Sequence, residues 1–270
     1  MNYLMIGASS AVAGELIKKL NKRYKAEDIR YTQEQDAGKG SDSESGKEGR
    51  LKPIVYAQYL NNDTAVTNLK EECDALDIRP VRCDLCSDED IEALLDVIRQ
   101  DKTEIGTLVY TAAAPLSYSR IRKWDVEKLR RDMQSGAIAF TQICSEIAPA
   151  MSKRGYGKIV VMLTSAISDL PPRFMADYVM IKSALWGYTK ALASEYSDKG
   201  LCVNALSPSM METAFLREID ERVVQADAES SPRKRHIRPD EVADAMMFLI
   251  SPESDYMTGV NLNLSGGEKM

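Results

Sequence analysis

Residues Tyr3–Lys22 read Y-L-M-I-G-A-S-S-A-V-A-G-E-L-I-K-K-L-N-K and join three kinds of segment. Tyr3–Ile6 is a short apolar run, and Gly7–Ser10 has the composition of a turn. Ala11–Lys22 carries apolar residues at helical spacing. The residues with that spacing are Val12, Leu16, Ile17 and Leu20. A buried strand that enters a helix through a tight turn is the opening unit of an α/β fold.

The same alternation of strand and helix patterns continues to the C-terminus. It predicts a single-domain, doubly wound (Rossmann-type) parallel sheet of about seven strands with helices on both faces, formed by residues 1–270. After the first strand, the predicted strands are Pro53–Leu60, Ile78–Cys83, Thr107–Thr111, Lys158–Thr164, Leu201–Ser207 and Asn261–Leu264. After the first helix, the predicted helices are Thr64–Leu76, Asp88–Gln100, Trp124–Arg154, Tyr178–Lys199 and Pro239–Ile250.

The stretch between the first helix and the second strand breaks the regular spacing. Residues 33–50 are polar, rich in glycine and serine, and almost free of apolar side chains, so we expect a solvated insertion within residues 24–52. Two segments compete for the second strand. Asp28–Thr32 lies at the usual distance after the first helix, whereas Pro53–Leu60 is more apolar and leads directly into a helix. We favour Pro53–Leu60.

The composition limits the classes of partner. The formal net charge of −6 makes nucleic acid an unexpected partner. No apolar run approaches the ~18 residues that a membrane span needs, and the N-terminus lacks a signal-peptide pattern. The five cysteines are an odd number, so we expect reduced thiols and a cytoplasmic protein.

The sequence Y-V-M-I-K holds the strongest chemical signal. Tyr178 and Lys182 are four residues apart and share one helix face, and Ser165 lies thirteen residues upstream of Tyr178. An ammonium beside a phenol favours the phenolate, so we expect Lys182 to lower the pKa of Tyr178. The phenol would then act as a general acid towards a carbonyl oxygen that the Ser165 hydroxyl holds.

The turn after the first strand can bind an anion. Backbone N–H groups at a helix N-terminus hold phosphate, and Gly7-Ala8-Ser9-Ser10 enters the first helix there. Together with the Ser165, Tyr178 and Lys182 pattern, this turn resembles the short-chain dehydrogenase/reductase family. The C-terminal segments Arg238–Leu249 and Thr258–Gly267 also resemble that family, and the branch with the most similar pattern is that of the 3-oxoacyl-carrier-protein reductases.

The resemblance implies an NAD(P)-dependent oxidoreductase that interconverts a ketone and an alcohol, with a small or carrier-bound carbonyl substrate such as a 3-oxoacyl thioester. Ser165, Tyr178 and Lys182 are then the catalytic residues, and no metal is expected. A homo-oligomer, tetrameric or dimeric, and a substrate lid at residues 209–236 are also implied. The implied cofactor contacts are Gly7, Ser9, Ser10, Ala11, Val12, Asn61, Asp84, Leu85, Ala112, Tyr178, Lys182, Pro208 and Thr213.

Several positions depart from the family pattern. Ala11 and Ala13 replace two glycines of the turn, and Ser209 replaces the glycine after Pro208. A methyl group at Ala11 could crowd a phosphate, and one at Ala13 could push the helix away from the strand. Tyr110-Thr111-Ala112-Ala113 stands in place of the family's asparagine-asparagine-alanine-glycine.

The family's catalytic asparagine, which holds a water in a proton relay, is also missing. The nearest residues are Ser135 and Gly136, which leaves the relay to Ser135, Gln134 or bulk water. We therefore expect slower proton transfer. A non-catalytic cofactor-binding or scaffold protein with the same fold is the rival hypothesis.

The choice of cofactor depends on the end of the second strand, where an acid favours NAD and a base favours NADP. Asn61 and Asn62 follow Pro53–Leu60 and no acid stands there, whereas Glu34 would follow Asp28–Thr32. The sequence leans towards NADP.

Three other features favour structural explanations. Cys83 and Cys86 form a C-x-x-C without a second pair, so we expect no metal there. His236 is the only histidine and is expected at the surface. Trp186 and Tyr188 are expected to pack in the core or at a subunit interface.

Overall fold

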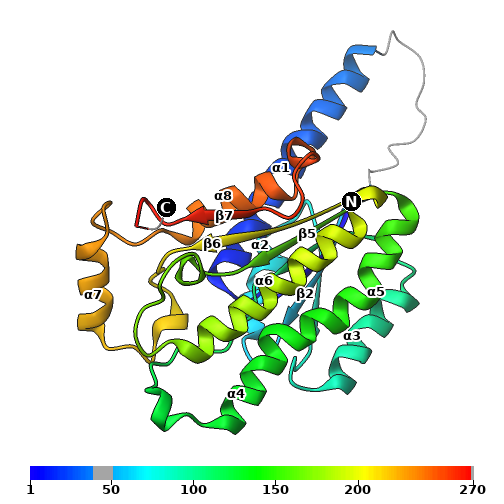
Figure 1. Cartoon of the computed structure of the whole chain (residues 1–270). Coiled ribbons are helices and arrows are strands. Elements are labelled where there is room, and N and C mark those ends of the chain that lie inside the picture. The colour runs from blue at the N-terminus through cyan, green and yellow to red at the C-terminus, as the bar shows by residue number, and fades with distance from the viewer. Residues whose placement is uncertain (39–50, 269–270) are drawn as a thin grey trace.

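The computed structural model describes residues 1–38 and 51–268. Seven parallel strands form one sheet in the order β3-β2-β1-β4-β5-β6-β7 (Figure 1), which confirms the predicted fold class. The strands are β1 (Asn2–Ile6), β2 (Ile54–Tyr59), β3 (Asp77–Arg82), β4 (Ile105–Tyr110), β5 (Gly157–Met162), β6 (Leu201–Pro208) and β7 (Asn261–Leu264).

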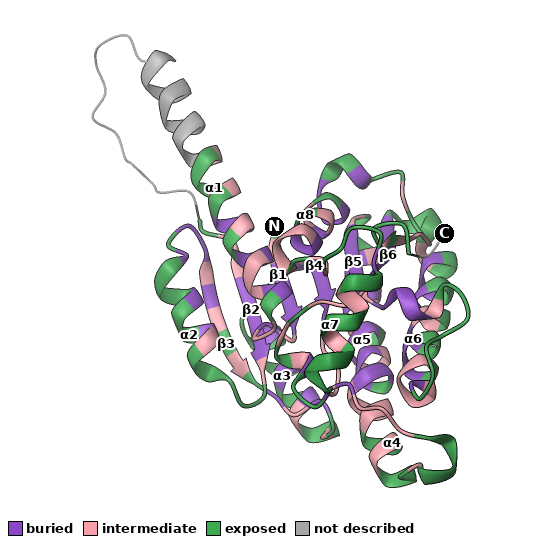
Figure 2. Cartoon of the chain, turned by 90° about the vertical axis from the view of Figure 1, so that its left-hand side faces the viewer, coloured by how far each residue is buried: buried purple, intermediate pink, exposed green. Residues whose placement is uncertain are grey.

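Helices cover both faces of the sheet, and the apolar side chains of each layer form a separate core cluster. Figure 2 shows buried strands between helices whose outer faces are exposed. One face carries α1 (Ala11–Gly38), α2 (Asp63–Glu72) and α8 (Pro239–Leu249). The other face carries α3 (Asp88–Gln100), α5 (Ala139–Arg154) and α6 (Ala176–Tyr196). The two remaining α-helices in the described residues are α4 (Val126–Met133) and α7 (Glu221–Ser230).

The segment after the first helix differs from the prediction. The strand favoured for the second position is confirmed, since β2 is Ile54–Tyr59 and pairs with β1 and β3. Asp28–Thr32 is helical, because α1 continues past Lys22 to Gly38. The Tyr24 hydroxyl lies 2.8 Å from that of Tyr3 in β1, so the helix is still anchored to the sheet there. The rest of the expected solvated insertion, residues 39–50, lies outside the described residues.

The long helix predicted for Trp124–Arg154 is interrupted. α4 ends at Met133, a π-helical turn spans Gln134–Ile138, and α5 follows directly. π-turns widen a helix locally and are frequent at functional sites. The helix α7 was not predicted, and it lies within the segment that the sequence suggested as a lid.

The strand order reverses between β1 and β4, which are neighbours in the sheet although far apart in the sequence. In open α/β sheets, ligands bind outside the carboxyl ends of the strands at such a switch point. The turn at Gly7 and the loop that begins at Thr111 follow these two strand ends. Within the described part of the chain, no helix has both the length and the apolar character needed to cross a bilayer.

Candidate active site

The three predicted catalytic residues lie at the carboxyl end of β5. Ser165 opens a 3-10 turn two residues after Leu163, while Tyr178 and Lys182 stand one turn apart on α6. The Lys182 Nζ lies 5.9 Å from the centroid of the Tyr178 ring and donates a hydrogen bond of 2.8 Å to the Met162 carbonyl. The Met162 carbonyl thereby fixes the ammonium beside the phenol.

The pKa of Tyr178 moves in the direction opposite to the prediction. Burial raises it to about 12, and a hydrogen bond with Thr164 offsets part of the rise. Burial lowers the pKa of Lys182 to about 8. The expected lowering of the Tyr178 pKa by Lys182 is therefore wrong, because desolvation of the phenol by burial controls the shift. At neutral pH the site holds a protonated phenol beside an ammonium, which is the charge state a proton donor needs.

Thr164 is a site residue that the sequence analysis missed. Its hydroxyl interacts with the Tyr178 phenol and also accepts the Ala166 N–H at 3.3 Å, which caps the turn carrying Ser165. Ser165 is buried, and its side chain makes no hydrogen bond to any residue that the structure describes. The only signal for Thr164 in the sequence was that it carries a hydroxyl group and stands directly before Ser165.

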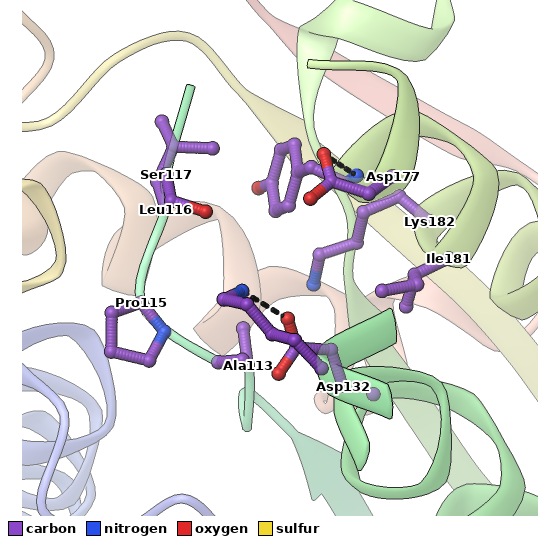
Figure 3. Close-up of a pocket in the computed structure, with 12 residues that line it drawn as sticks. Ala113, Pro115, Leu116, Ser117, Asp132, Asp177, Ile181 and Lys182 are labelled. Carbon is purple, nitrogen blue, oxygen red and sulfur yellow. Dashed lines mark hydrogen bonds and ion pairs between the residues drawn. The ribbon is translucent and has the colours of Figure 1, made fainter. Parts of the chain in front are cut away.

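A pocket opens beside Tyr178 and Lys182 (Figure 3). Most of its wall is apolar, and its charged residues are Lys128, Asp132 and Asp177 besides Lys182. Lys128 Nζ lies 2.5 Å from a carboxylate oxygen of Asp132. The other lining residues are Ala113, Ala114, Pro115, Leu116, Ser117, Gly136 and Ile181.

The segment after β6 packs over Tyr178. The Phe215 ring lies 5.8 Å from the Tyr178 ring, and the Leu116 N–H donates to the Phe215 carbonyl at 3.4 Å. Leu216 and Met210 join the same apolar cluster. This segment thus forms part of the apolar surroundings of the phenol and is linked by its backbone to the loop after β4.

The turn after β1 keeps one glycine for a steric reason. Gly7 has φ +82°, and a Cβ there would lie 2.8 Å from both the Ala112 nitrogen and Thr111 Oγ1. The Thr111 hydroxyl contacts the Ile6 carbonyl at 3.0 Å, and it lies 3.2 Å from Ser10 Oγ. Thr111, which replaces a family asparagine, therefore fastens the end of β4 to the turn.

The alanines that replace glycine in this turn are accommodated. Ala11 is exposed at the start of α1, whereas Ala13 is buried and α1 still packs on the sheet. Ser10 Oγ accepts the Ala13 N–H at 3.3 Å. Within the described part of the chain, the N–H groups of Ala11 and Val12 have no hydrogen-bond acceptor, as is usual in a first helical turn. Backbone donors at a helix N-terminus are the groups that commonly hold phosphate.

Gln58 is a second residue that the sequence analysis missed. This buried side chain accepts the Gly7 N–H at 2.8 Å and donates to the Cys83 carbonyl at 2.7 Å, which joins the ends of β1, β2 and β3. The predicted cofactor residues that follow β2 and β3 differ from one another in exposure and in contacts. Asn61 is exposed, and the Asp84 carboxylate accepts the Cys86 N–H at 2.9 Å while Leu85 is buried.

The last predicted cofactor residues lie at the end of β6. Pro208 closes the strand, and the Ser209 N–H donates to the Leu264 carbonyl at 3.1 Å. The Thr213 hydroxyl accepts the Phe215 N–H at 3.4 Å and caps the short turn that brings Phe215 to the tyrosine. This loop and the turn after β1 both begin at the carboxyl edge of the sheet. Open α/β sheets bind their ligands at that edge.

Ser135 and Gln134, the predicted relay residues, point elsewhere. The Ser135 hydroxyl donates to the Arg131 carbonyl at 3.3 Å, and the Gln134 amide donates to Asp88 at 3.2 Å. Of the residues in the π-turn, Gly136 lines the pocket.

The remaining sequence features are structural. The side chain of His236 is 9% exposed, not at the surface as expected, because it packs 3.3 Å from the Asp227 carboxylate. Cys83 is buried and Cys86 exposed, and no metal-binding cluster of acidic, histidine or cysteine side chains exists among the described residues. Trp186 and Tyr188 pack against the core, as predicted.

The structure is a doubly wound α/β protein in which Ser165, Tyr178 and Lys182 lie at the carboxyl edge of the sheet. A family model described as enoyl-(acyl carrier protein) reductase matches residues 53–269. Nodulation protein G of Azospirillum brasilense is 30% identical over 185 residues, which cover 68% of this chain and 74% of that protein. The 3-oxoacyl-[acyl-carrier-protein] reductase FabG of Escherichia coli is 28% identical over 180 residues, covering 67% and 73%.

A solved structure, a 3-oxoacyl-[acyl-carrier protein] reductase with bound NAD from Brucella melitensis, has a TM-score of 0.79 at 22% identity and covers 100% of this chain and 91% of its own. The chain belongs to the short-chain dehydrogenase/reductase family, in the branch similar to 3-oxoacyl-carrier-protein reductases. It is an NAD(P)-dependent oxidoreductase.

Proposed function

We propose that this protein reduces the ketone of a 3-oxoacyl thioester, or of a similar apolar 3-oxo compound, with NADPH as the reductant. The observation that carries the proposal is the pairing of a buried phenol with a fixed ammonium beside an apolar pocket. The same site would oxidise the alcohol in the reverse direction.

The described residues fit a dinucleotide. The free N–H groups of Ala11 and Val12 would hold its pyrophosphate, and Gly7 would let the backbone approach it closely. Ser9, Ser10, Asn61, Asp84, Leu85, Ala112, Pro208 and Thr213 remain the proposed further contacts. When bound, the dinucleotide supplies a hydride to the substrate carbon.

The chain's own residues move the proton. Tyr178 donates its phenolic proton to the substrate oxygen while the Ser165 hydroxyl hydrogen-bonds the same oxygen. Lys182 stabilises the phenolate that forms and would hold the ribose of the dinucleotide. The hydrogen bond with Thr164 lowers the pKa of the phenol and so favours the loss of its proton.

The preference for NADPH rests on the ends of β2 and β3. No acidic residue stands at 60–62, where a carboxylate would bind ribose hydroxyls and repel a phosphate. Arg82 ends β3 as an exposed residue, and it is the strand partner of Tyr59 at the end of β2. Its guanidinium is the basic group that would pair with a 2′-phosphate.

The substrate class rests on the apolar wall. Leu116, Ile181 and Phe215 surround the phenol with apolar surface that suits a short acyl chain better than a sugar. We also propose that residues 209–236 act as a substrate lid, since Phe215 in this segment packs against the Tyr178 ring at 5.8 Å. We also predict that each chain forms a single domain. We predict further that the chains form a homo-oligomer through α5 and α6.

The test is a turnover assay with purified protein, NADPH and acetoacetyl-CoA, a simple 3-oxoacyl thioester. Wild-type protein should consume NADPH, and Tyr178→Phe should bind NADPH without consuming it. Binding without turnover of acetoacetyl-CoA, of its free acid and of cyclic ketones would instead favour the scaffold hypothesis.

A further inference from the structure

The pocket beside Tyr178 is small. It encloses a volume of ≈ 20 Å³, and one water molecule needs about 10–15 Å³ of such space. Its walls are the loop after β4, the end of α4 with the π-turn, and α6. Figure 3 shows Ile181 and Lys182 reaching into it from α6. A substrate group that enters this space must be small, so the residue that limits the space selects the substrate.

Apart from the Tyr178 ring, the largest apolar side chains in these walls are Leu116 and Ile181, and they are supported differently. Leu116 lies on the loop after β4, donates its N–H to the Phe215 carbonyl, and belongs to the same apolar cluster as Leu216. Its position is therefore tied to the proposed lid. Ile181 lies on α6, whose inner face packs on the sheet, so it forms the fixed wall.

Ile181 does not serve the core of the protein. It is buried, at 7% exposure, yet none of the three apolar clusters formed by the described residues contains it. Its close neighbour is Gly136 in the π-turn, where a Cβ would lie 2.6 Å from Ile181 Cγ2. A β-branched side chain on a helix has one strongly preferred rotamer. The chain thus places a stiff side chain at position 181 and none at position 136.

We propose that Ile181 is a specificity-determining residue that restricts the acyl group of the substrate to the size of 3-oxobutanoyl. This inference rests on the proposed reduction of a 3-oxoacyl thioester. The C3 carbonyl must reach Tyr178, and the bulky thioester carrier must stay towards solvent. The acyl end beyond C3 is therefore the part that enters the pocket. A single methyl group, about the size of a water molecule, fits there, whereas a propyl group meets Ile181.

The experiment compares acetoacetyl-CoA with 3-oxohexanoyl-CoA, which is two methylenes longer, as substrates for the full chain with NADPH. Wild-type protein should prefer acetoacetyl-CoA in kcat/KM by about tenfold or more, since one methylene in an apolar pocket changes kcat/KM by about 10–200-fold. Ile181→Ala should shift the ratio of the two kcat/KM values towards 3-oxohexanoyl-CoA by about tenfold or more.

Two further variants separate specificity from folding. Ile181→Val is a smaller change that keeps Cγ2 beside Gly136, and it should shift the ratio in the same direction by less. Met180→Ala is the control, because Met180 precedes Ile181 on α6 but is 39% exposed and does not line the pocket. It should keep the wild-type ratio.

A binding measurement gives a readout without turnover. Calorimetric titration with 3-hydroxybutanoyl-CoA and 3-hydroxyhexanoyl-CoA should give Kd values whose ratio shifts in Ile181→Ala in the same direction as the kcat/KM ratio. A purely structural role of Ile181 would weaken both thioesters alike and leave both ratios unchanged.

The same kcat/KM ratio in wild type and Ile181→Ala would overturn the proposal. So would a wild-type protein that reduces both thioesters equally well. Failure of the proposed function is a different result, in which wild-type protein reduces neither thioester. The ratio of the Kd values would then still decide the role of Ile181.

Discussion

The two halves of the sheet's carboxyl edge are built on different principles. Around β5, the proposed chemistry belongs to the side chains of Ser165, Tyr178 and Lys182, which residue type and spacing in the sequence indicated. Around β1, the candidate phosphate site consists of backbone N–H groups. Because alanines replace two family glycines there, the sequence did not show whether these groups remain unbonded. The structure retains those donors, because Gln58 and Thr111 hold the turn from neighbouring strands. The proposed phosphate site thus depends on backbone donors, which the alanines at positions 11 and 13 leave in place.

The largest effect should come from the catalytic half. Tyr178→Phe keeps the ring contact with Phe215 but removes the proton donor, so kcat should fall by roughly 10²–10⁴-fold or more. NADPH affinity, measured by fluorescence titration, should change little. Tyr118→Phe is the matched control, since Tyr118 lies in the same apolar cluster, and it should leave kcat near the wild-type value.

The corresponding change in the cofactor half is Gly7→Ala. A methyl group there meets backbone of the β4 end at 2.8 Å and requires φ +82°. We expect the free energy of unfolding to fall by roughly 1–3 kcal/mol or more, with weakened NADPH binding, as measured by denaturant titration and fluorescence.

Ala11→Gly tests whether the alanine that replaces a family glycine affects cofactor binding. It restores a family glycine at an exposed position, so it should leave NADPH affinity within a few-fold of wild type. A large gain in affinity would mean that the Ala11 methyl obstructs the phosphate after all.

The pH dependence of reduction should report Lys182. Burial lowers the pKa of its ammonium, so the ammonium is present below about pH 8 and is lost as the pH rises through that value. The rate of reduction should therefore be level near neutral pH and fall about tenfold per pH unit above about pH 8, as loss of one essential proton requires. Lys182→Arg keeps its charge, and its alkaline limb should disappear. The same limb in both proteins would assign it to another group.

A further prediction concerns cofactor choice. Arg82→Ala should weaken NADPH binding by roughly tenfold, or about 1.4 kcal/mol, and leave NADH binding unchanged. Arg79→Ala is the control, since Arg79 lies on the same strand but pairs with Asp77 and Asp101. An equal loss for both cofactors would exclude a 2′-phosphate contact at Arg82.

The sequence predicted the sheet well, because buried parallel strands are nearly continuous apolar runs and their spacing by helices leaves few topologies. It failed at the length of α1. The segment D-I-R-Y-T fits a strand or a helix equally, and the helix is favoured by contacts on the preceding turn, such as Arg23 with Glu27 at 3.1 Å. Such local pairs are weak signals in a sequence.

The parts of the site that escaped prediction depend on tertiary contacts. Gln58 resembles any polar residue of a strand until its partners on two other strands are known. The Tyr178 pKa was predicted from its neighbour in sequence, yet desolvation by Phe215, Leu116 and the surrounding apolar cluster controls it. The π-turn that carries Gly136 into the pocket wall is a packing feature with no periodic signature in the sequence.

The most direct test of the central claim is a single-turnover experiment with wild-type and Tyr178→Phe proteins, each saturated with NADPH and mixed with acetoacetyl-CoA. We predict that wild-type protein converts one equivalent of NADPH and forms the 3-hydroxy thioester, while Tyr178→Phe binds NADPH equally well and converts almost none. Equal conversion by both proteins would contradict the assignment of Tyr178 as the proton donor.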